Sequence, residues 1–413
     1  MSKQVWILCG LACISIARAE QIAIVGGRVE VRPGTVIENG VVVIDNDRIT
    51  EVGAGVTAPA GARVIDAKGK YVYAGFIDGY STRGLKLPDA PAAAAARPVL
   101  VTAPATMWPE NRKGIRAQLD ASKHVDLATV MPDCHKAGFT AGFLNPGQGT
   151  IRGSGALAYL TDAKSEPASM GMELSFRGGS GAGYPSSLMG IVALMRQTFL
   201  DAIHQNQFPP EKPDPDYAAL APLLTGKAPG VFHVDTEADV VRAVAMGEEF
   251  KFAVILKGGR DAHKRAAWLA EKTVPVLADI AIGTEPKVEP SADGPPAGVL
   301  EERRDNWRIR ASGPKKLHDA GVLFAFISDG DSLPKFLENV RMVVKQGLPK
   351  DAALKAMTVS PAQIFGRSSD LGTLERGKLA NVVVASGDIF TEGSKVETVV
   401  VLGKVFTYTE KQS

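Results

Sequence analysis

The most informative run in this chain of 413 residues is Ala74-Gly75-Phe76-Ile77-Asp78-Gly79-Tyr80-Ser81-Thr82. It completes a β-branched and aromatic segment, Tyr71 to Asp78, for which we predict a strand. Tyr80 and Thr82 follow this strand with a phenol and an aliphatic hydroxyl. Both groups are poor ligands for a zinc-like ion, which proteins hold with imidazole, thiolate or carboxylate groups.

Strand and helix patterns alternate from residue 75 to residue 370, as a parallel α/β barrel requires. We predict seven strands, at Tyr71–Asp78, Phe139–Leu144, Leu174–Phe176, Gly230–Val234, Phe252–Leu256, Val274–Ile280 and Leu323–Ser328. A complete barrel has one strand more, and we expect it between Phe176 and Gly230. The predicted helices are Leu188–His204, Glu237–Glu249, Asp261–Glu271, Lys315–Ala320, Leu333–Gln346 and a final one from Asp351 to Thr358.

Several segments between these elements read as loops. Two are rich in proline, Pro88–Pro109 and Glu285–Gly298, and would lie at the C-terminal face of a barrel, where active sites form. The glycine-rich runs 145–155 and 177–183 lack the Gly-Lys-Ser/Thr ending of a phosphate-binding loop, so we interpret them as tight turns at the barrel mouth. We interpret Met107–Lys113 as a surface loop, with a lid or a partner contact as the alternative.

The two ends of the chain share another texture. Residues 22–73 and 371–408 are short β-rich segments separated by turn residues such as Asp45-Asn46-Asp47 and Gly403-Lys404.

Motifs at both ends, in the right order, resemble the amidohydrolase superfamily, and most closely its imidazolonepropionase-like branch. They are Ile24-Val25-Gly26-Gly27-Arg28-Val29, Ile65-Asp66-Ala67-Lys68-Gly69-Lys70, the run at residues 74–82, and Leu371-Gly372-Thr373-Leu374-Glu375-Arg376-Gly377-Lys378-Leu379-Ala380-Asn381. The resemblance implies an α/β fold, a TIM-type (β/α)8 barrel with a small β-sandwich built from both ends. The barrel would comprise residues 75–370, and the sandwich residues 20–74 plus 371–413.

The resemblance also implies a metal centre, most of whose ligands this sequence lacks. The family uses two histidines after strand one, a Lys or Glu near strand four, histidines after strands five and six, and an aspartate after strand eight. Tyr80 and Thr82 replace the first two histidines, while His233 and Asp329 match the positions after strands five and eight. A zinc ion would need help from Asp235, Lys257 or His263, so we expect no catalytic metal and no other cofactor.

By this resemblance the protein is a hydrolase of carbon–nitrogen bonds, in cyclic amides or peptides, with a degenerate metal site. Asp329 and His233 are the candidate catalytic residues. The structural alternatives are that Asp329 is a strand-end aspartate whose carboxylate accepts hydrogen bonds from backbone amides, and that His233 is a hydrogen-bonded pocket histidine. The alternative function is a non-catalytic subunit that binds a small-molecule or peptide-like ligand, as a homo-oligomer or beside an active homologue.

Residues 1–19 read as a secretory signal peptide, with Lys3, an apolar run from Val5 to Ile16, and Ala17-Arg18-Ala19 before Glu20. We therefore predict a periplasmic or extracellular protein with no membrane span in the mature chain. Its acidic and basic residues would then be equal in number, so nothing favours binding to nucleic acid. Cys134 would be the remaining cysteine, and we expect it to be a buried small hydrophobe.

Overall fold

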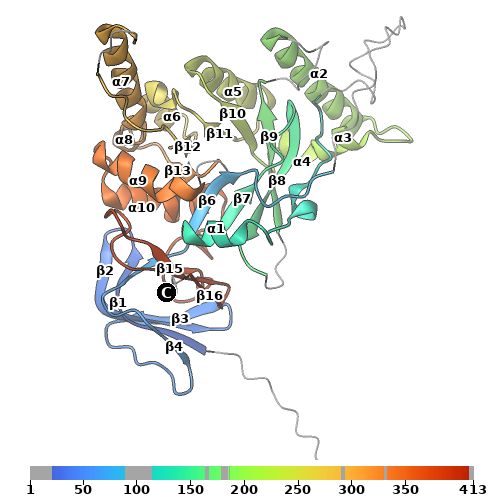
Figure 1. The fold of residues 1–413 in the computed structure, drawn as a ribbon. Coiled ribbons are helices and arrows are strands. Elements are labelled where there is room, and N and C mark those ends of the chain that lie inside the picture. Colours follow the sequence, from blue (N-terminus) through green and yellow to red (C-terminus); the bar gives the residue numbers. More distant parts are fainter. Residues whose placement is uncertain are drawn as a thin grey trace, which may run out of the picture.

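The computed structural model describes residues 21–88, 114–162, 167–177, 185, 187–289, 294–329 and 333–408. The predicted signal peptide, Met107–Lys113, residues 178–183 and nearly all of the loop 88–109 lie outside these ranges, and export stays a prediction. Among the described residues, no helix has the length and apolar character needed to cross a membrane. Figure 1 shows a larger α/β body above a smaller sheet that combines the first and last strands of the chain.

The smaller sheet joins the two ends of the chain by hydrogen bonds. Residues Ala74 and Val382 face each other where β5 pairs with β14, and fourteen apolar residues from both ends form a core of their own. The predicted pairing of the two terminal segments is therefore confirmed, and their strands form one sheet. Its strands are β1 (Gln21–Arg32), β2 (Thr35–Asp45), β3 (Arg48–Gly53), β4 (Arg63–Asp66), β5 (Tyr71–Ala74), β14 (Val382–Ala385), β15 (Val396–Val401) and β16 (Lys404–Thr407).

The segment predicted as one strand, Tyr71–Asp78, is two strands in different sheets. The chain leaves β5 at Ala74 and enters β6 (Phe76–Ser81) of the larger sheet. Gly75 lies at the crossing, where a Cβ atom would be 2.2 Å from the Thr140 hydroxyl oxygen. Only glycine allows the two sheets to approach this closely.

The larger sheet has eight strands and forms the barrel, which confirms the predicted fold class. The strands are β6, β7 (Phe139–Leu144), β8 (Ile151–Tyr159), β9 (Ala168–Ser175), β10 (Gly230–Val234), β11 (Val254–Gly258), β12 (Val276–Asp279) and β13 (Phe324–Ile327). All neighbouring pairs are parallel except those of β8, which is antiparallel to both β7 and β9.

The expected place of the eighth strand was therefore wrong. It precedes β9 rather than lying between Phe176 and Gly230, and its first residues belong to the glycine-rich run that we interpreted as a turn. Gly153 and Gly155 are needed inside this strand because a Cβ atom would be 2.2 Å from the Leu119 carbonyl and 2.5 Å from the Asn145 amide oxygen, respectively. Glycines that are needed for close packing inside a strand thus look like turn residues in the sequence.

Alternation along the parallel strands fills the barrel. Val231, Ile255, Leu277 and Ile327 belong to one interior cluster together with Tyr80. The intervening residues pack outward against the helices in a second cluster, which includes Phe232, Leu256 and Val276. Side chains two residues beyond the interior positions point the same way, so polar residues there form the top layer of the barrel.

The helices surround the barrel (Figure 1). They are α1 (Met131–Lys136), α2 (Leu188–Gln207), α3 (Pro215–Ala219), α4 (Ala221–Leu224), α5 (Glu237–Phe250), α6 (Ala266–Glu271), α7 (Ala297–Ala311), α8 (Gly313–Asp319), α9 (Phe336–Lys345), α10 (Lys350–Met357) and α11 (Val359–Ile364), with 3₁₀ turns at Ala121–His124, Ala262–Arg265 and Leu333–Lys335. Helix α7 was not predicted, because its sequence is strongly polar and lacks an apolar stripe. Cys134 on α1 is buried as expected, and burial raises the pKa of its thiol to about 12.

Asp78 joins the two edges of the barrel sheet, where β6 lies beside β13. Its carboxylate accepts hydrogen bonds from the Ser328 backbone N–H at 2.9 Å, from the Ser328 hydroxyl and from the Tyr80 backbone N–H at 3.2 Å. Burial nevertheless raises the pKa of Asp78 to about 7. The signature aspartate of the first strand is therefore a structural residue that closes the barrel.

We expect Asp78→Asn to remove a pH dependence of stability. The native carboxyl keeps its proton up to about pH 7, whereas the unfolded chain loses it near pH 4. Between these values the native state binds more protons, so the unfolding free energy of the wild type falls as pH rises, by about 1.4 kcal/mol per pH unit from this group. Urea unfolding of both proteins at pH 5 and pH 7 measures the difference, and equal slopes would contradict it.

Candidate functional site

A cavity of about 380 Å³ opens among the charged residues at the C-terminal ends of the barrel strands. Both candidate catalytic residues line it, His233 at the end of β10 and Asp329 just after β13. Lys257, at the end of β11, and Asp279, at the end of β12, complete the same layer. Each lies two residues beyond an interior apolar residue, which explains why four strands direct polar groups into one space. Arg177, Asp235, Gly258 and Arg260 also line this cavity.

The two replacements after the first strand lie apart. Tyr80 is fully buried beneath the cavity, whereas Thr82 is exposed. His263, which we named as a possible helper ligand, lines a neighbouring cavity instead.

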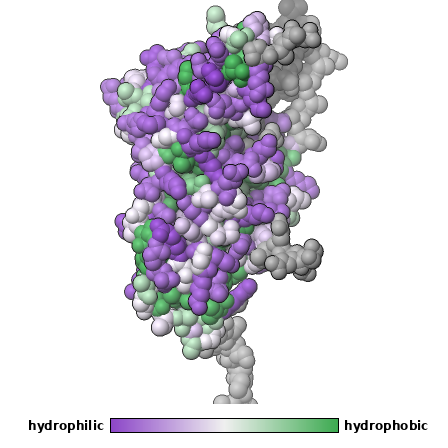
Figure 2. Space-filling model, turned by 60° about the vertical axis from the view of Figure 1, so that its left-hand side comes forward, coloured by the Kyte–Doolittle hydropathy of each residue, from purple (hydrophilic) through white to green (hydrophobic). Residues whose placement is uncertain are grey.

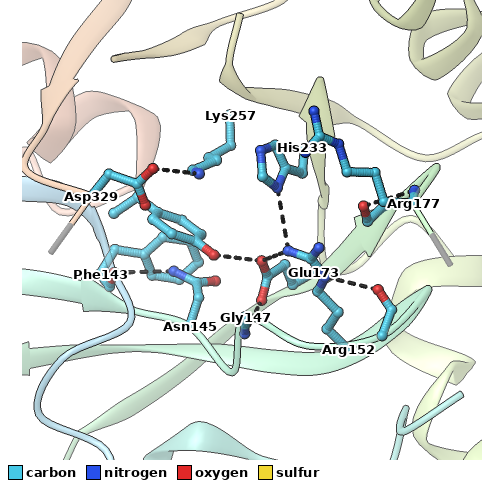
Figure 3. Close-up of polar contacts among 12 residues, drawn as sticks. Phe143, Asn145, Gly147, Arg152, Glu173, Arg177, His233, Lys257 and Asp329 are labelled. Atoms are coloured by element: carbon cyan, nitrogen blue, oxygen red, sulfur yellow. Dashed lines mark hydrogen bonds and ion pairs between the residues drawn. The ribbon is translucent and has the colours of Figure 1, made fainter. Parts of the chain in front are cut away.

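Glu173 on β9 is the central acid of the site, although it is only 1% exposed. Its carboxylate accepts hydrogen bonds from the Tyr80 hydroxyl at 2.6 Å, from Arg152 Nη1 at 2.7 Å and from the Gly147 backbone N–H at 2.8 Å. Figure 3 shows Arg152 and Gly147 beside Glu173. Burial, followed by the negative charge of Glu173, raises the pKa of Tyr80 well above 10, so Tyr80 remains a neutral phenol.

Arg152 reaches the mouth because β8 runs against the other strands. It is the second residue of β8, and the start of an antiparallel strand lies at the end where the parallel strands finish. Its Nε also donates to the Gly149 carbonyl at 2.9 Å, which fixes the guanidinium plane. With 6% exposure, Arg152 forms a buried ion pair with Glu173.

Lys257 provides a second buried cation and is 3% exposed. Its ammonium donates to Asp329 Oδ2 at 3.0 Å and lies 4.5 Å from the centre of the Tyr80 ring. The chain turns sharply after Lys257, because Gly258 has a φ of 92° and a Cβ there would lie 2.9 Å from the Val234 carbonyl oxygen. Asp329 also has a positive φ, 43°, a conformation that aspartate tolerates better than most residues.

His233 is a neutral imidazole in a positive field. Its burial, and then Lys257, Arg152, Arg177 and Arg260, lower its pKa to about 3. Arginine only donates, so His233 Nδ1, 3.4 Å from Arg152 Nη1, is an acceptor and the ring proton lies on Nε2. This Nε2 is 4.0 Å from Asp235 Oδ1, and Asp235 itself pairs with Arg177.

Three residues of this network were missed in the sequence: Glu173, Arg152 and Arg177. Glu173 had a signal, since it is an acid in an otherwise apolar segment, Met170 to Leu174, on the fourth barrel strand. The resemblance implies a Lys or Glu near this strand. Arg152 had no such signal in the sequence, because it reaches the barrel mouth only if β8 runs antiparallel to its neighbours.

The donor set does not match the needs of a divalent ion. Tyr80 stays protonated, Glu173 is saturated by three donors, and Asp329 already binds an ammonium. The described residues contain no group of three or more His, Cys, Asp and Glu side chains arranged to hold a metal. Fixed cations stand where a metal would need electron-pair donors.

Comparisons with known proteins agree with the fold. Residues 308–406 match the sequence model of the amidohydrolase family, and no curated protein sequence matches significantly. An amidohydrolase structure from Thermotoga maritima has a TM-score of 0.76 at 21% identity, covering 94% of this chain and 100% of that one. A prolidase complexed with N-methylphosphonate-L-proline scores 0.58 at 20% identity, and a Xaa-Pro dipeptidase with bound methionine scores 0.55 at 14% identity, each covering 94% of this chain and 100% of the other.

The resemblance to amidohydrolases is therefore confirmed, although nothing singles out the imidazolonepropionase-like branch. At these identities the structural likeness establishes the fold alone.

We expect Arg152→Leu to destabilise the protein by about 3–5 kcal/mol, because it leaves the buried Glu173 carboxylate without its cation. The double variant R152L/E173L should recover much of this loss, since it buries no charge. The matched control is Arg196→Leu, which breaks an exposed pair with Glu249 and should cost less than about 1 kcal/mol. Urea unfolding measures all three, and equal losses in R152L and R196L would refute the role of the buried pair.

The His233 ring should remain neutral from pH 8 down to about pH 4, in line with its pKa of about 3. Lys257→Met removes the cation that lowers this pKa most after burial, so the pKa should rise. Imidazole NMR signals followed with pH measure both values, and His233→Asn identifies the resonance. A wild-type midpoint near 6.5 would disprove the positive field.

Proposed function

We propose that this chain binds a small ligand at its barrel mouth without the metal-assisted hydrolysis typical of amidohydrolases. The ion pair between Lys257 and Asp329 carries the proposal. By the resemblance, these positions after the sixth and eighth strands would hold a histidine and an aspartate that share a metal. Here a lysine takes the place of that histidine, and its ammonium donates a hydrogen bond to Asp329.

The electrostatics of the site support this proposal. Arg152 and Lys257 supply two buried positive charges beside the two acids that a metal would need, Glu173 and Asp329. A divalent ion would have to displace both cations, or approach them at unfavourable distances in a poorly screened interior. We therefore derive no chemical step through a metal.

Acid–base chemistry without a metal has little support from the same residues. A general base works best when its pKa lies near the working pH. The pKa of His233 is about 3, which makes the imidazole a weak base, and Asp329 is occupied by Lys257. Asp235, the nearest acid to His233, is paired with Arg177. These groups are suited to hold a polar ligand rather than to move its protons.

Hydrolysis is the second candidate function, and the match of residues 308–406 to the amidohydrolase family supports it. In that case Asp329 would be the proton acceptor, and its ion pair with Lys257 would have to break during each turnover. A role beside an active homologue is compatible with the binding function and remains a proposal.

Metal analysis tests the proposal directly. We expect the purified wild type to contain far less than one zinc, manganese or iron per chain, by elemental analysis. The double variant Tyr80→His, Lys257→His should gain zinc, because it adds two imidazoles to His233 and Asp329 and removes one cation. Adding His233→Asn to that variant should weaken zinc binding again.

Two results would overturn the proposal. One is about one tightly held metal per wild-type chain. The other is hydrolysis of amide or dipeptide substrates by the wild type that Asp329→Asn reduces by about a hundredfold or more, the scale of a general acid–base group. Circular dichroism and thermal unfolding verify that each variant is folded.

A further inference from the structure

We infer that the ligand is an apolar α-amino acid, held across two adjoining cavities at the barrel mouth. The inference rests on the proposed binding function. A second cavity of about 240 Å³ lies beside the first. Gly258, Arg260 and Asp279 line both cavities, so one ligand can contact both.

The charges at this junction are incompletely matched. In the first cavity, Arg177 pairs with Asp235, and Lys257 pairs with Asp329. Within the described ranges, Arg260 and Asp279 have no ion-pair partner. Asp279 uses one oxygen, Oδ1, to accept a hydrogen bond from the Ala281 backbone N–H at 2.8 Å. One cation and one carboxylate oxygen therefore remain for a ligand at the boundary between the cavities.

The second cavity adds another cation and an apolar wall. Arg310 lines it and likewise has no ionic partner in the described part of the chain. The apolar wall consists of Ala278, Ala281, Ile282, Pro314 and Leu317. A carboxylate matches the arginines, an ammonium matches Asp279, and an aliphatic side chain matches the wall. An amino acid such as leucine carries all three groups on one carbon.

The surrounding structure holds these groups in place. The imidazole of His263, 7% exposed, donates from Nδ1 to the Arg260 carbonyl oxygen at 3.0 Å, so His263 is a positioning residue for Arg260. Helix α7 carries Arg310 and is anchored by a hydrogen bond of 2.9 Å from Trp307 Nε1 to the Gly283 carbonyl. Arg308 on the same helix pairs with Glu285 at 2.7 Å.

Helix α7 is otherwise polar, and hydrophilic residues dominate the face where it and α8 lie (Figure 2).

Calorimetric titration of the full chain with L-leucine tests the inference. We expect leucine to bind, and three analogues to bind at least about tenfold more weakly, because each lacks one recognised group. They are 4-methylpentanoate without the ammonium, leucinamide without the carboxylate, and glycine without the side chain. Leucylglycine tests whether a dipeptide replaces the free amino acid, and its binding tenfold more tightly than leucine would overturn the assignment of the free amino acid.

Variants separate recognition from structural damage. Asp279→Asn should weaken leucine binding at least about tenfold while leaving 4-methylpentanoate binding unchanged or improved, because only the ammonium loses its partner. Arg310→Gln should weaken both ligands. The matched control Arg303→Gln, on the same helix and exposed, should affect neither. Equal weakening of both ligands by D279N would indicate misfolding or indirect effects and would count against the assignment.

Failure of the inference and failure of the proposed function are distinguishable. Metal-free protein that does not hydrolyse substrates and does not bind leucine contradicts the ligand assignment alone. Leucine binding that is insensitive to D279N and R310Q does the same. Stoichiometric metal with hydrolysis overturns the proposed function, whatever the leucine titration shows.

Discussion

The site is organised around a buried acid that must have a positive partner. Glu173 is almost fully inaccessible to solvent, and an ionised carboxylate in such a place is strongly unfavourable unless charge and hydrogen bonds compensate it. Arg152, Tyr80 and the Gly147 backbone N–H supply that compensation. Burial and then the charge of Glu173 raise the pKa of Tyr80, which stays neutral. Arg152 also lies near His233, and after burial and Lys257 it contributes to lowering the pKa of that imidazole. The negative charge of Glu173 is thus met by groups of the chain itself.

Much of the fold was predictable because it depends on periodic patterns. Seven barrel strands follow from β-branched segments and their turns. The pairing of the chain ends was implied by the motifs there that resemble amidohydrolases, and the structure contains it. Strand β8 was not predictable this way. Gly153 and Gly155 resemble turn residues, and nothing local in the sequence states that a strand runs backwards. Helix α7 was not predicted because its sequence is polar and shows no apolar face, although its Trp307 side chain is buried.

The site was predictable only in part, and the reason is geometric. His233 and Asp329 were found because they match the positions after strands five and eight that the resemblance implies, and the ends of parallel strands place them at one mouth. Lys257 was named as a possible helper ligand because of its position, but its ion pair with Asp329 could be identified only from the three-dimensional structure. Arg152 required the direction of β8 to be known. Charge pairing between distant strands is a property of three-dimensional neighbours, which a single sequence does not specify.

The reversal of β8 also changes how the site can assemble during folding. Parallel neighbours in a barrel meet only after a long crossover, whereas β7, β8 and β9 follow one another as antiparallel neighbours with local contacts. Arg152 and Glu173 are 21 residues apart and face each other within this meander. The loop that must close to bring them together is short, so its entropic cost is small. The cation that compensates Glu173 is thus encoded close to it in the sequence, inside a unit of strands that pair locally.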